Sequence, residues 1–470
     1  MTKSKIRKPV FGVLGLTVAA AVTLTGCGGA QGNSSNAQSN GSGGSQPGGQ
    51  FSGQKLTLNV FVGKDTGFAQ QQQQMLNQFA KDFEQQNPNV TINYSFYSSS
   101  SEENTTLQTS LTSNQGPDIF EFGSTFIPTA YATNGFHVFS GQDWTAIGGQ
   151  SKFFPSALSM SGPSPNQLIG VPETVAPYGM LVNTKLMQAA GITSPPTTWQ
   201  QFVTDAQKMT NPSKNQWGTA MDPADSFDPW HICWVLAKDA GGDFVSANGK
   251  NATMNSSQVV QAMQFWFDWM TKYQIASPSD VTNKGVDDLH QFENGKIGML
   301  VMQSSNDIVG LNNSQVKNNY TYVPMPTIPY GQSSIPQGGK AVGSFVSGQY
   351  LSVPKYVTGA KYQAALKFIN FLTSPAQQTQ FYTQISTQPA NMNVWKSDKD
   401  LETPLMKAFY QGEQNSVATP FSGAWGNVEV IFGGAANKIA TEIATKQYKS
   451  GDIQSVLAAA NSQVQSALQQ

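Results

Sequence analysis

The sequence predicts an α/β protein with two lobes, and two observations support this. The chain has 470 residues, which is more than one ordinary hydrophobic core accommodates. Residues 55–62 alternate as a strand does, a helix pattern runs from about Phe68 to Gln86 and stops at Asn87-Pro88, and residues 90–94 form a second strand pattern. Strand, helix and strand at this spacing predict a βαβ unit and therefore an α/β sheet.

Later segments carry helix-start signals and one loop signal. Thr198-x-x-Gln201 and Ser374-Pro375-x-Gln377 both fit a capping box, the second with proline at the first helical position. The aromatic residues of the helix pattern 257–274 are expected to pack in a core. Residues 324–339 are rich in proline and glycine, which predicts a surface loop.

The N-terminus predicts an export signal over residues 1–26. A basic start precedes an apolar run from Val10 to about Val22, which is too short for a comfortable transmembrane helix. Leu24-Thr25-Gly26-Cys27 follows and resembles the lipobox of bacterial lipoproteins. That resemblance implies cleavage before Cys27 and acylation of its thiol, which would anchor the protein to the outer side of the cell membrane. The alternative is a plain signal peptide with an incidental cysteine.

Residues 27–54 predict a flexible tether, because they are mostly Gly, Ser, Gln and Asn and carry no charge. With Cys27 acylated, Cys233 is the only thiol left, which excludes a structural disulfide.

The charge pattern argues against nucleic acid and against anionic ligands. Only 12% of the residues are charged, and without the four cations of the first 26 residues the chain has 23 basic and 28 acidic residues, a net charge of -5. Arg7 is the only arginine. Because arginine is the usual bidentate partner of carboxylate and phosphate groups, a neutral, hydroxyl-rich ligand is favoured.

The residues that could carry chemistry do not form a motif, so no metal, cofactor or catalytic activity is expected. The three histidines are far apart, and no zinc, calcium or nucleotide motif is present. His231 and Cys233 are two residues apart and would point in different directions from a strand or a helix. Asp222, Asp225 and Asp228 fit turns and helix starts better than a calcium site.

Several motifs follow one another along the chain. They are GPDIF (116–120) followed by YATNGF (131–136), the long stretch 169–210, FENGKIGM (292–299) and AALKFINFLTSPAQQTQFY (364–382). Together they resemble the family 1 extracellular solute-binding proteins of ABC importers, to which maltose-binding protein belongs. The resemblance implies a periplasmic-binding-protein-like fold of type II, in which two α/β lobes joined by crossing hinge strands hold a ligand between them. It places the N-terminal lobe at 55–173 plus 350–415 and the C-terminal lobe at 178–345 plus 420–470.

The same resemblance suggests the ligand-binding residues. Trp230 and Trp425 fall where sugar-binding members stack a ring on tryptophan, and Asp65 falls where they bind hydroxyl groups. Further cleft residues implied by position are Tyr178, Ser124 and Phe122. Core packing remains the alternative for both tryptophans, and a turn the alternative for Asp65.

The sequence departs from maltose-binding protein at two places, so ligand identity does not carry over. Ser305 stands where that protein has a tryptophan, and Thr125 and Phe126 replace its basic and acidic pair. Gln303 or Ser305 is expected to supply hydrogen bonds instead. Trp234, one helical turn after Trp230, is either a second stacking surface or packing support.

The sequence thus predicts a monomeric, membrane-tethered binding protein that delivers a neutral mono- or oligosaccharide to an ABC permease. A polyol or glycerophosphodiester binding protein is the first alternative. A secreted carbohydrate-active enzyme, which would need a carboxylate pair in the cleft, is the second. A purely structural lipoprotein without a ligand is the third. The low charge also suggests adaptation to an acidic exterior.

Overall fold

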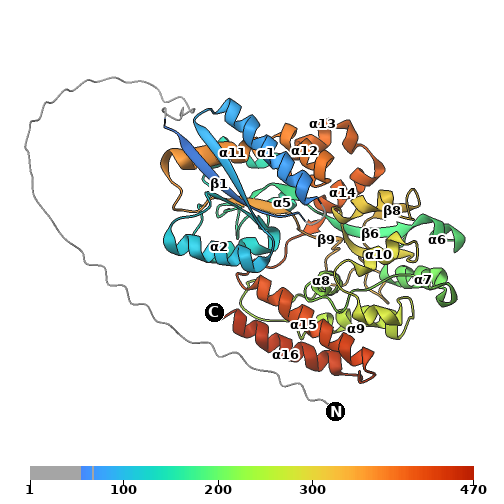
Figure 1. The fold of residues 1–470 in the computed structure, drawn as a ribbon. Coiled ribbons are helices and arrows are strands. Elements are labelled where there is room, and N and C mark those ends of the chain that lie inside the picture. The colour runs from blue at the N-terminus through green and yellow to red at the C-terminus, as the bar shows by residue number, and fades with distance from the viewer. Residues whose placement is uncertain (1–53, 66–67, 470) are drawn as a thin grey trace, which may run out of the picture. The chain divides into compact units, whose positions relative to one another are not determined.

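A computed structural model describes residues 54–65 and 68–469, and they form two α/β lobes (Figure 1). Each lobe has its own sheet with helices packed around it, as the sequence predicted. The signal segment, Cys27 and the tether lie outside the described residues. No helix among the described residues is long and apolar enough to cross a membrane.

The first lobe is built on a five-stranded sheet with the order β2-β1-β3-β10-β4. Strands β1, β2 and β3 are parallel, whereas β10 pairs antiparallel with both β3 and β4. The strands span Val90–Tyr97 (β2), Leu56–Gly63 (β1), Ile119–Gly123 (β3), Gln349–Ser352 (β10) and Val171–Pro172 (β4).

The predicted βαβ unit is confirmed. Helix α1, Ala69–Gln86, connects β1 to the parallel strand β2, with Leu56 opposite Val90. The buried side of α1 includes Phe79 and Phe83, whose rings pack edge-on against aromatic residues of α11 and α12.

Helices cover both faces of this sheet. In Figure 1, α11 and α12 lie with α1 above the sheet, and α2 lies below it. The remaining helices of the first lobe span Ser100–Ser113 (α2), Ile127–Ala132 (α3), Gly141–Ile147 (α4), Pro155–Leu158 (α5), Gly359–Leu372 (α11), Pro375–Ile385 (α12) and Met392–Ser397 (α13).

The second lobe is built on a three-stranded antiparallel sheet, in which β6 (Tyr178–Asn183) lies between β7 (Met299–Ser304) and β8 (Tyr320–Val323). Helices α15 and α16 run side by side at the C-terminal end of the chain (Figure 1). The helices of this lobe span Thr184–Ala189 (α6), Trp199–Met209 (α7), Pro229–Asp239 (α8), Ser257–Thr271 (α9), Asp287–Glu293 (α10), Trp425–Ala444 (α15) and Asp452–Ala467 (α16).

Short strands mark the passages between the lobes. β5 (Thr174–Val175) pairs with β11 (Gln388–Pro389), and β9 (Ser344–Phe345) pairs in parallel with β12 (Ser416–Val417). Strands β5, β9 and β12 lie close to the expected lobe boundaries at 173–178, 345–350 and 415–420.

The two predicted helix starts are confirmed in position, but neither forms the full set of hydrogen bonds of a capping box. Thr198 caps α7 by accepting the N–H of Gln201, and the Gln201 side chain accepts the N–H of Thr197 rather than that of Thr198. Pro375 opens α12, but the Ser374 hydroxyl donates to Gln377 Oε1 and makes no cap to the backbone. The aromatic core of α9 is confirmed, because Trp266, Phe267 and Trp269 are buried.

Helix α14, Pro404–Gln414, packs across the expected lobe division. Its residues Met406 and Phe409 share a hydrophobic cluster with Leu181 of β6 and Leu300 of β7. The lobe boundaries given above assign this helix to the N-terminal lobe, and they stay a prediction.

Gly348 provides a test of the interlobe crossing. Its backbone has φ 149°, and a Cβ there would lie 2.1 Å from the Thr174 carbonyl oxygen. We expect Gly348→Ala to lower the free energy of unfolding by about 2 kcal/mol or more, because it adds strain and a clash. Urea unfolding followed by circular dichroism measures this. Gly343→Ala is the matched control, since no atom lies within 4 Å of its Cβ position; equal losses in the two variants would contradict the expectation.

Candidate functional site

A cleft of about 820 Å³ lies between residues of the two lobes. The first lobe contributes the ends of β1 and β3 and the start of α1, and the second lobe contributes β6, α8 and the end of β7. The crossing segments, residues 173–176 and 345–349, line it as well. We call this cavity the cleft.

The topology of the first sheet brings polar residues to the cleft. The parallel strands β1, β2 and β3 end at Gly63, Tyr97 and Gly123, and all three residues line the cavity. Ligands of α/β sheets commonly bind beyond these carboxyl ends, where loops can carry side chains that the buried strands cannot.

Two buried glutamates form the acidic part of the cleft. Glu121 of β3 and Glu173, just after β4, line the cavity and have 7% and 2% of their surface exposed. Their carboxyl groups are in hydrogen-bonding contact with each other. Burial raises the pKa of Glu173 to about 7. Burial and the neighbouring Glu173 charge raise the pKa of Glu121 well above its usual value, so the pair keeps at least one proton at neutral pH.

Asp65 lies in the cleft, as predicted, and also has the structural role that the sequence left open. Its Oδ1 accepts the Phe68 N–H at 2.5 Å, directly before α1. Its own N–H donates to Gln72 Oε1, and Gln72 Nε2 donates to the Gly63 carbonyl. The first turns of α1 thus fix the loop that carries Asp65.

Aromatic rings form the wall contributed by the second lobe. Tyr178 packs on Phe345 with ring centroids 4.6 Å apart, and the His231 ring stacks on Phe345 at 4.8 Å. Phe227 lies edge-on to Trp230 and has 39% of its surface exposed. All five residues line the cleft, which therefore has carboxyl groups on one side and aromatic surface on the other.

The structure does not present the two predicted stacking tryptophans as open surfaces. Trp230 lines the cleft but has only 1% of its surface exposed. Trp425 is fully buried behind it, with the two rings edge-on at 5.8 Å, and does not line the cavity. Trp425 instead belongs to the core of the second lobe together with Phe244 and Phe432.

Phe122 and Trp234 are also core residues rather than cleft residues. Phe122 is fully buried between the rings of Phe120 and Phe136. Trp234 is fully buried and donates its indole N–H to Asp243 Oδ1 at 2.9 Å. Trp234 is not among the residues that line the cleft, which agrees with packing support as its role.

The three predicted hydrogen-bonding residues occupy different places. Ser124 lines the cleft, where its hydroxyl donates to the Val346 carbonyl of the crossing segment at 3.0 Å. Ser305 is buried and donates to Gln388 Oε1, away from the cavity. Gln303 lines a neighbouring pocket and donates to Asp288 Oδ2 at 3.2 Å.

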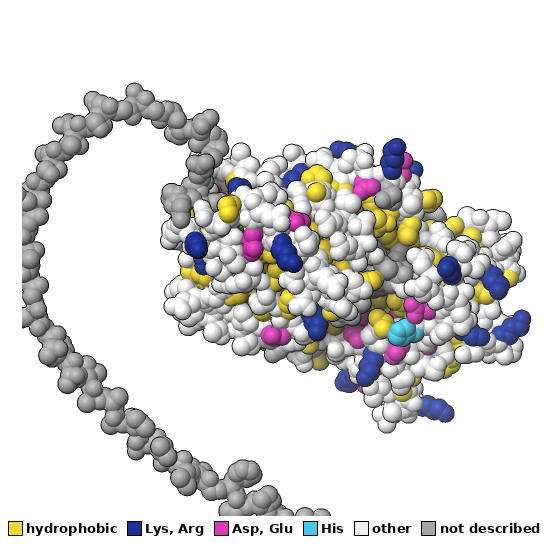
Figure 2. All heavy atoms as spheres, turned by 45° about the horizontal axis from the view of Figure 1, so that its top comes forward, with side chains coloured by type: hydrophobic (Ala, Val, Ile, Leu, Met, Phe, Trp, Pro, Cys, Tyr) yellow, Lys and Arg dark blue, Asp and Glu magenta, His cyan; other side chains and the backbone are white. Residues whose placement is uncertain are grey.

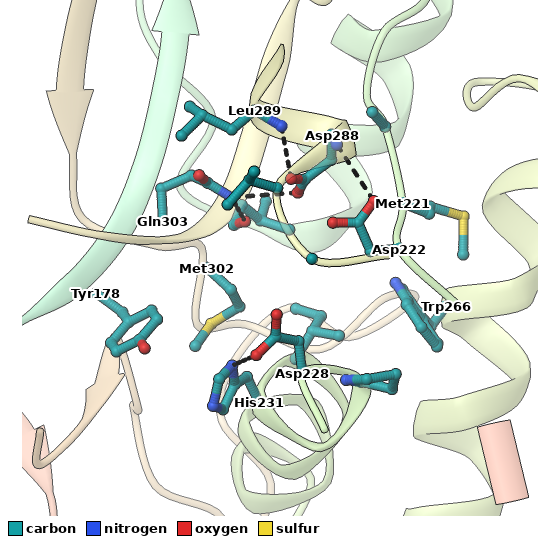
Figure 3. Close-up of a pocket in the computed structure, with 16 residues that line it drawn as sticks. Tyr178, Met221, Asp222, Asp228, His231, Trp266, Asp288, Leu289, Met302 and Gln303 are labelled. Carbon is teal, nitrogen blue, oxygen red and sulfur yellow. Dashed lines mark hydrogen bonds and ion pairs between the residues drawn. The ribbon is translucent and has the colours of Figure 1, made fainter. Parts of the chain in front are cut away.

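That neighbouring pocket has a volume of about 120 Å³ and lies within the second lobe (Figure 3). It shares Tyr178, His231 and Leu289 with the cleft. The carboxyl groups of Asp222 and Asp288 face each other there, and Figure 3 shows Gln303 beside them. Burial and the Asp288 charge raise the pKa of Asp222 to about 10, so this pair also holds a proton.

The histidine and the cysteine of α8 do not form a reactive pair. Burial lowers the pKa of His231 to about 3, so its ring is neutral and its 3.7 Å contact with Asp228 is not an ion pair at neutral pH. Cys233 is fully buried, and burial raises the pKa of its thiol. Such a thiol is inert.

The three regularly spaced aspartates build turns in part, as expected. Asp225 accepts the N–H groups of Phe227, Asp228 and Gly285. Asp222, in contrast, belongs to the carboxyl pair with Asp288, which the sequence did not predict. Among the described residues, no group of three or more His, Cys, Asp or Glu side chains could hold a metal ion.

Glu121 and Glu173 were missed by the sequence analysis although a signal was present. Glu121 is the only charged residue in the strand IFEFG, and Glu173 follows Val-Pro at a crossing strand. A charged residue inside a buried strand is unusual and points to a site, particularly in a chain with so few charges. Figure 2 shows this scarcity, with charged side chains scattered over a mainly uncharged face.

A comparison with known protein families identifies the family of this chain. The profile of the family described as "Bacterial extracellular solute-binding protein" matches residues 69–379. The chain belongs to this family. Membership of an extracellular family implies a location outside the cytoplasm.

Curated relatives are distant. The chain is 22% identical to the maltodextrin-binding protein MdxE of Bacillus subtilis over 291 residues, which are 59% of this chain and 64% of the relative. A probable ABC transporter-binding protein of Deinococcus radiodurans is 25% identical over 280 residues, or 54% of this chain and 59% of the relative. Both matches thus span less than two thirds of the relative's length.

Solved structures show the same fold at low identity. Maltose-bound MalE3 of T. maritima has a TM-score of 0.70 and 19% identity, and covers 87% of this chain and all of its own. A solute-binding protein of Agrobacterium radiobacter K84 in complex with ribitol has a TM-score of 0.69 and 17% identity, and covers 88% of this chain and 99% of its own. These similarities confirm the two-lobe type II fold.

The buried carboxyl groups outside the cleft predict how stability depends on pH. Burial raises the pKa of Asp280 to about 7 and of Asp239, Glu413 and Glu429 to about 8. The folded state therefore holds protons that the unfolded chain releases, so stability falls as pH rises from the ordinary carboxyl pKa to about 8. We expect a higher urea midpoint at pH 5 than at pH 8.5.

Glu413 allows a test of whether buried, protonated carboxyl groups cause this pH dependence of stability. It is fully buried and accepts the Ser156 hydroxyl at 2.7 Å. Glu413→Gln should reduce the fall in midpoint between pH 5 and 8.5, because one titrating group is removed. Glu402→Gln, at an exposed position, should leave the fall unchanged. A midpoint that is constant or rises with pH in the native protein would show that these groups are not protonated in the fold.

Proposed function

We propose that this protein binds an uncharged carbohydrate in the cleft and delivers it to an ABC permease, as a monomer tethered to the membrane by lipidated Cys27. The observation that carries the proposal is the chemistry of the cleft walls, with Glu121, Glu173 and Asp65 on one side and aromatic rings on the other. A sugar has hydroxyl groups at its edges and C–H groups on its faces, and such a pair of walls complements both.

The two-lobe arrangement supports capture by closure. The carboxyl groups belong to the first lobe and its crossing strand, whereas Tyr178, Phe227 and Trp230 belong to the second. A ligand that contacts both walls stabilises the state in which the lobes are together, so binding and closure are coupled. A permease can then distinguish the loaded from the empty protein.

An anionic ligand such as a glycerophosphodiester is disfavoured by the charges of the cleft. Lys64 is the one lysine among the described residues that line it, and the neutral His231 supplies no charge. A polyol stays compatible, and the ribitol complex of a similar fold supports keeping it as the second candidate.

An enzyme is disfavoured by geometry and by family. The cleft contains the carboxyl groups of Asp65, Glu121 and Glu173, so it has the two carboxyl groups that a glycosidase would need. However, Glu121 and Glu173 are in direct contact, whereas the two carboxyl groups of glycosidases are about 5–9.5 Å apart to admit the sugar or water between them. Incubation with oligosaccharides should leave these intact, and hydrolysis of any of them would refute the proposal.

Ligand binding can be tested on the aromatic wall. A thermal-shift screen with glucose, maltose, maltotriose, tagatose and ribitol should stabilise the protein with at least one of them. For that ligand we expect Phe227→Ala to raise the Kd by roughly tenfold, or about 1.4 kcal/mol, because a partly exposed cleft ring is lost. Val430→Ala removes an exposed apolar side chain outside the cleft and should not change the Kd. No shift with any sugar, or equal effects of the two variants, would contradict the proposal.

The lipid anchor can be tested by cell fractionation. Cys27→Ser should move the protein from the membrane fraction to the medium or periplasm, because the acyl chains can no longer be attached. Cys233→Ser is the matched control and should stay with the membrane, since Cys233 is buried in the second lobe. Retention of the Cys27 variant at the membrane would rule out the lipoprotein assignment.

A further inference from the structure

The contact between Glu121 and Glu173 depends on the order of strands in the first sheet. Glu121 lies on β3 and Glu173 directly follows β4, and β10 lies between these two strands. The Glu173 N–H donates to the Gln349 carbonyl at 2.8 Å, and Glu121 accepts the Gly63 N–H at 3.3 Å. The backbone therefore places both residues at the cleft, and the Glu121 carboxyl group is also held there by the Gly63 N–H.

In the described part of the chain, no cation pairs with these two glutamates. Across residues 54–65 and 68–469, neither glutamate forms an ion pair with a lysine. The charged or titratable groups around the pair are Asp65, Glu103, Tyr94 and Tyr97, with Lys64 and His231 on the cleft lining. Two carboxylates in contact repel each other and have no hydrogen between them, so the contact itself requires a proton.

Three buried polar atoms on residues that line the cleft have no hydrogen-bond partner among the described residues. The indole N–H of Trp230, a residue with 1% exposure, has no hydrogen-bond partner among the described residues. Gln349 Oε1 and Asn306 Oδ1, on two other segments of the lining, also lack partners there. Buried donors and acceptors without partners are rare in native proteins, so these three atoms make the walls of the cleft unusual.

When a ligand replaces the contact between the two carboxyl groups, the single acid O–H can donate to a ligand oxygen and the carboxylate can accept a ligand O–H. A carboxylic acid donates, and a carboxylate accepts. Each hydroxyl group of a sugar or polyol also donates and accepts, so two adjacent hydroxyls match an acid–carboxylate pair. A cation would favour two carboxylates over an acid–carboxylate pair, and an anion would find Lys64 as the one lysine among the described cleft residues.

We propose that Glu121 and Glu173 are the polar centre of the cleft, where they act as an acid–carboxylate pair that binds two adjacent hydroxyl groups of an uncharged polyhydroxy ligand. This inference rests on the proposed function and adds its specificity-determining residues. Glu121 is the donor and Glu173 the acceptor, because the Glu173 charge holds the proton on Glu121. The protonated carboxyl group supplies a hydrogen-bond donor to a cleft that has no arginine.

The two residues are distinguished by their glutamine variants. Glu121→Gln keeps a donor in place of the acid O–H and should stay within about threefold of the native Kd, measured by calorimetry with the best ligand among glucose, maltose, maltotriose, tagatose and ribitol. Glu173→Gln removes the carboxylate and should raise the Kd at least tenfold, as should Glu121→Ala. Glu413→Gln, a buried acid outside the cleft, is the control and should leave the Kd unchanged.

Infrared spectroscopy supplies a readout that does not depend on a ligand. The native protein should show the carbonyl stretch of a protonated carboxyl group near neutral pH, and Glu121→Gln should reduce its intensity relative to the Glu402→Gln control. An unchanged band would overturn the proton-sharing pair.

The outcomes separate this inference from the proposed function. If none of the five uncharged probes binds the folded native protein, both are overturned. If a probe binds and the two glutamine variants are equally impaired or equally normal, only the pair is overturned. Tighter binding of glucosamine than of glucose would also overturn it, because the site would then act as two carboxylates.

Discussion

Strand β10 pairs antiparallel with β3 on one side and with β4 on the other, and the rest of the site depends on this insertion. The chain leaves the first lobe after β4 and returns along β10, so both passages are held in one sheet at the cleft. Gly348, at φ 149°, allows the close approach of this passage to Thr174. Its carbonyl accepts the Ser124 N–H, which joins the passage to the end of β3. Backbone hydrogen bonds thus fix the cleft floor, and the side chains there need no flexibility of their own.

The small number of charges has a consequence for those that are buried. The chain has no arginine beyond Arg7, and several buried carboxyl groups in its described part, among them Glu121, Glu173 and Glu413, form no ion pair with a lysine. Neutral protonated acids are then the favourable state, because a buried charge without a partner is costly. The same condition that makes Glu121 and Glu173 share a proton in the cleft recurs for Asp222 and Asp288 in the neighbouring pocket. This agrees with an acidic exterior as the setting, which stays a hypothesis.

The tryptophans show why residue type alone cannot separate a binding surface from a core. Trp230, Trp234 and Trp425 all lie on helices of the second lobe, and all three are almost fully buried. Both roles demand large rings near other apolar groups, so the same local pattern serves either. The neighbours decide the role: Phe345 and His231 place Trp230 at the cleft, whereas Phe244 places Trp425 in the core.

The sequence by itself determined the fold class, the βαβ unit at the start of the first lobe, the aromatic core of α9 and the family. These follow from periodicity, from residues with strong local preferences and from motifs in a conserved order along the chain, all of which are local properties. It also placed Asp65, Ser124, Tyr178 and Trp230 among the cleft-lining residues. Only the tertiary structure decided that Phe122, Trp234 and Trp425 are core residues and that Glu121 meets Glu173. Those outcomes depend on which segments become neighbours in the fold. Strand β10, which pairs with both β3 and β4, lies more than 170 residues beyond Glu173 in the chain. Over such a separation, local sequence patterns carry no information about contact.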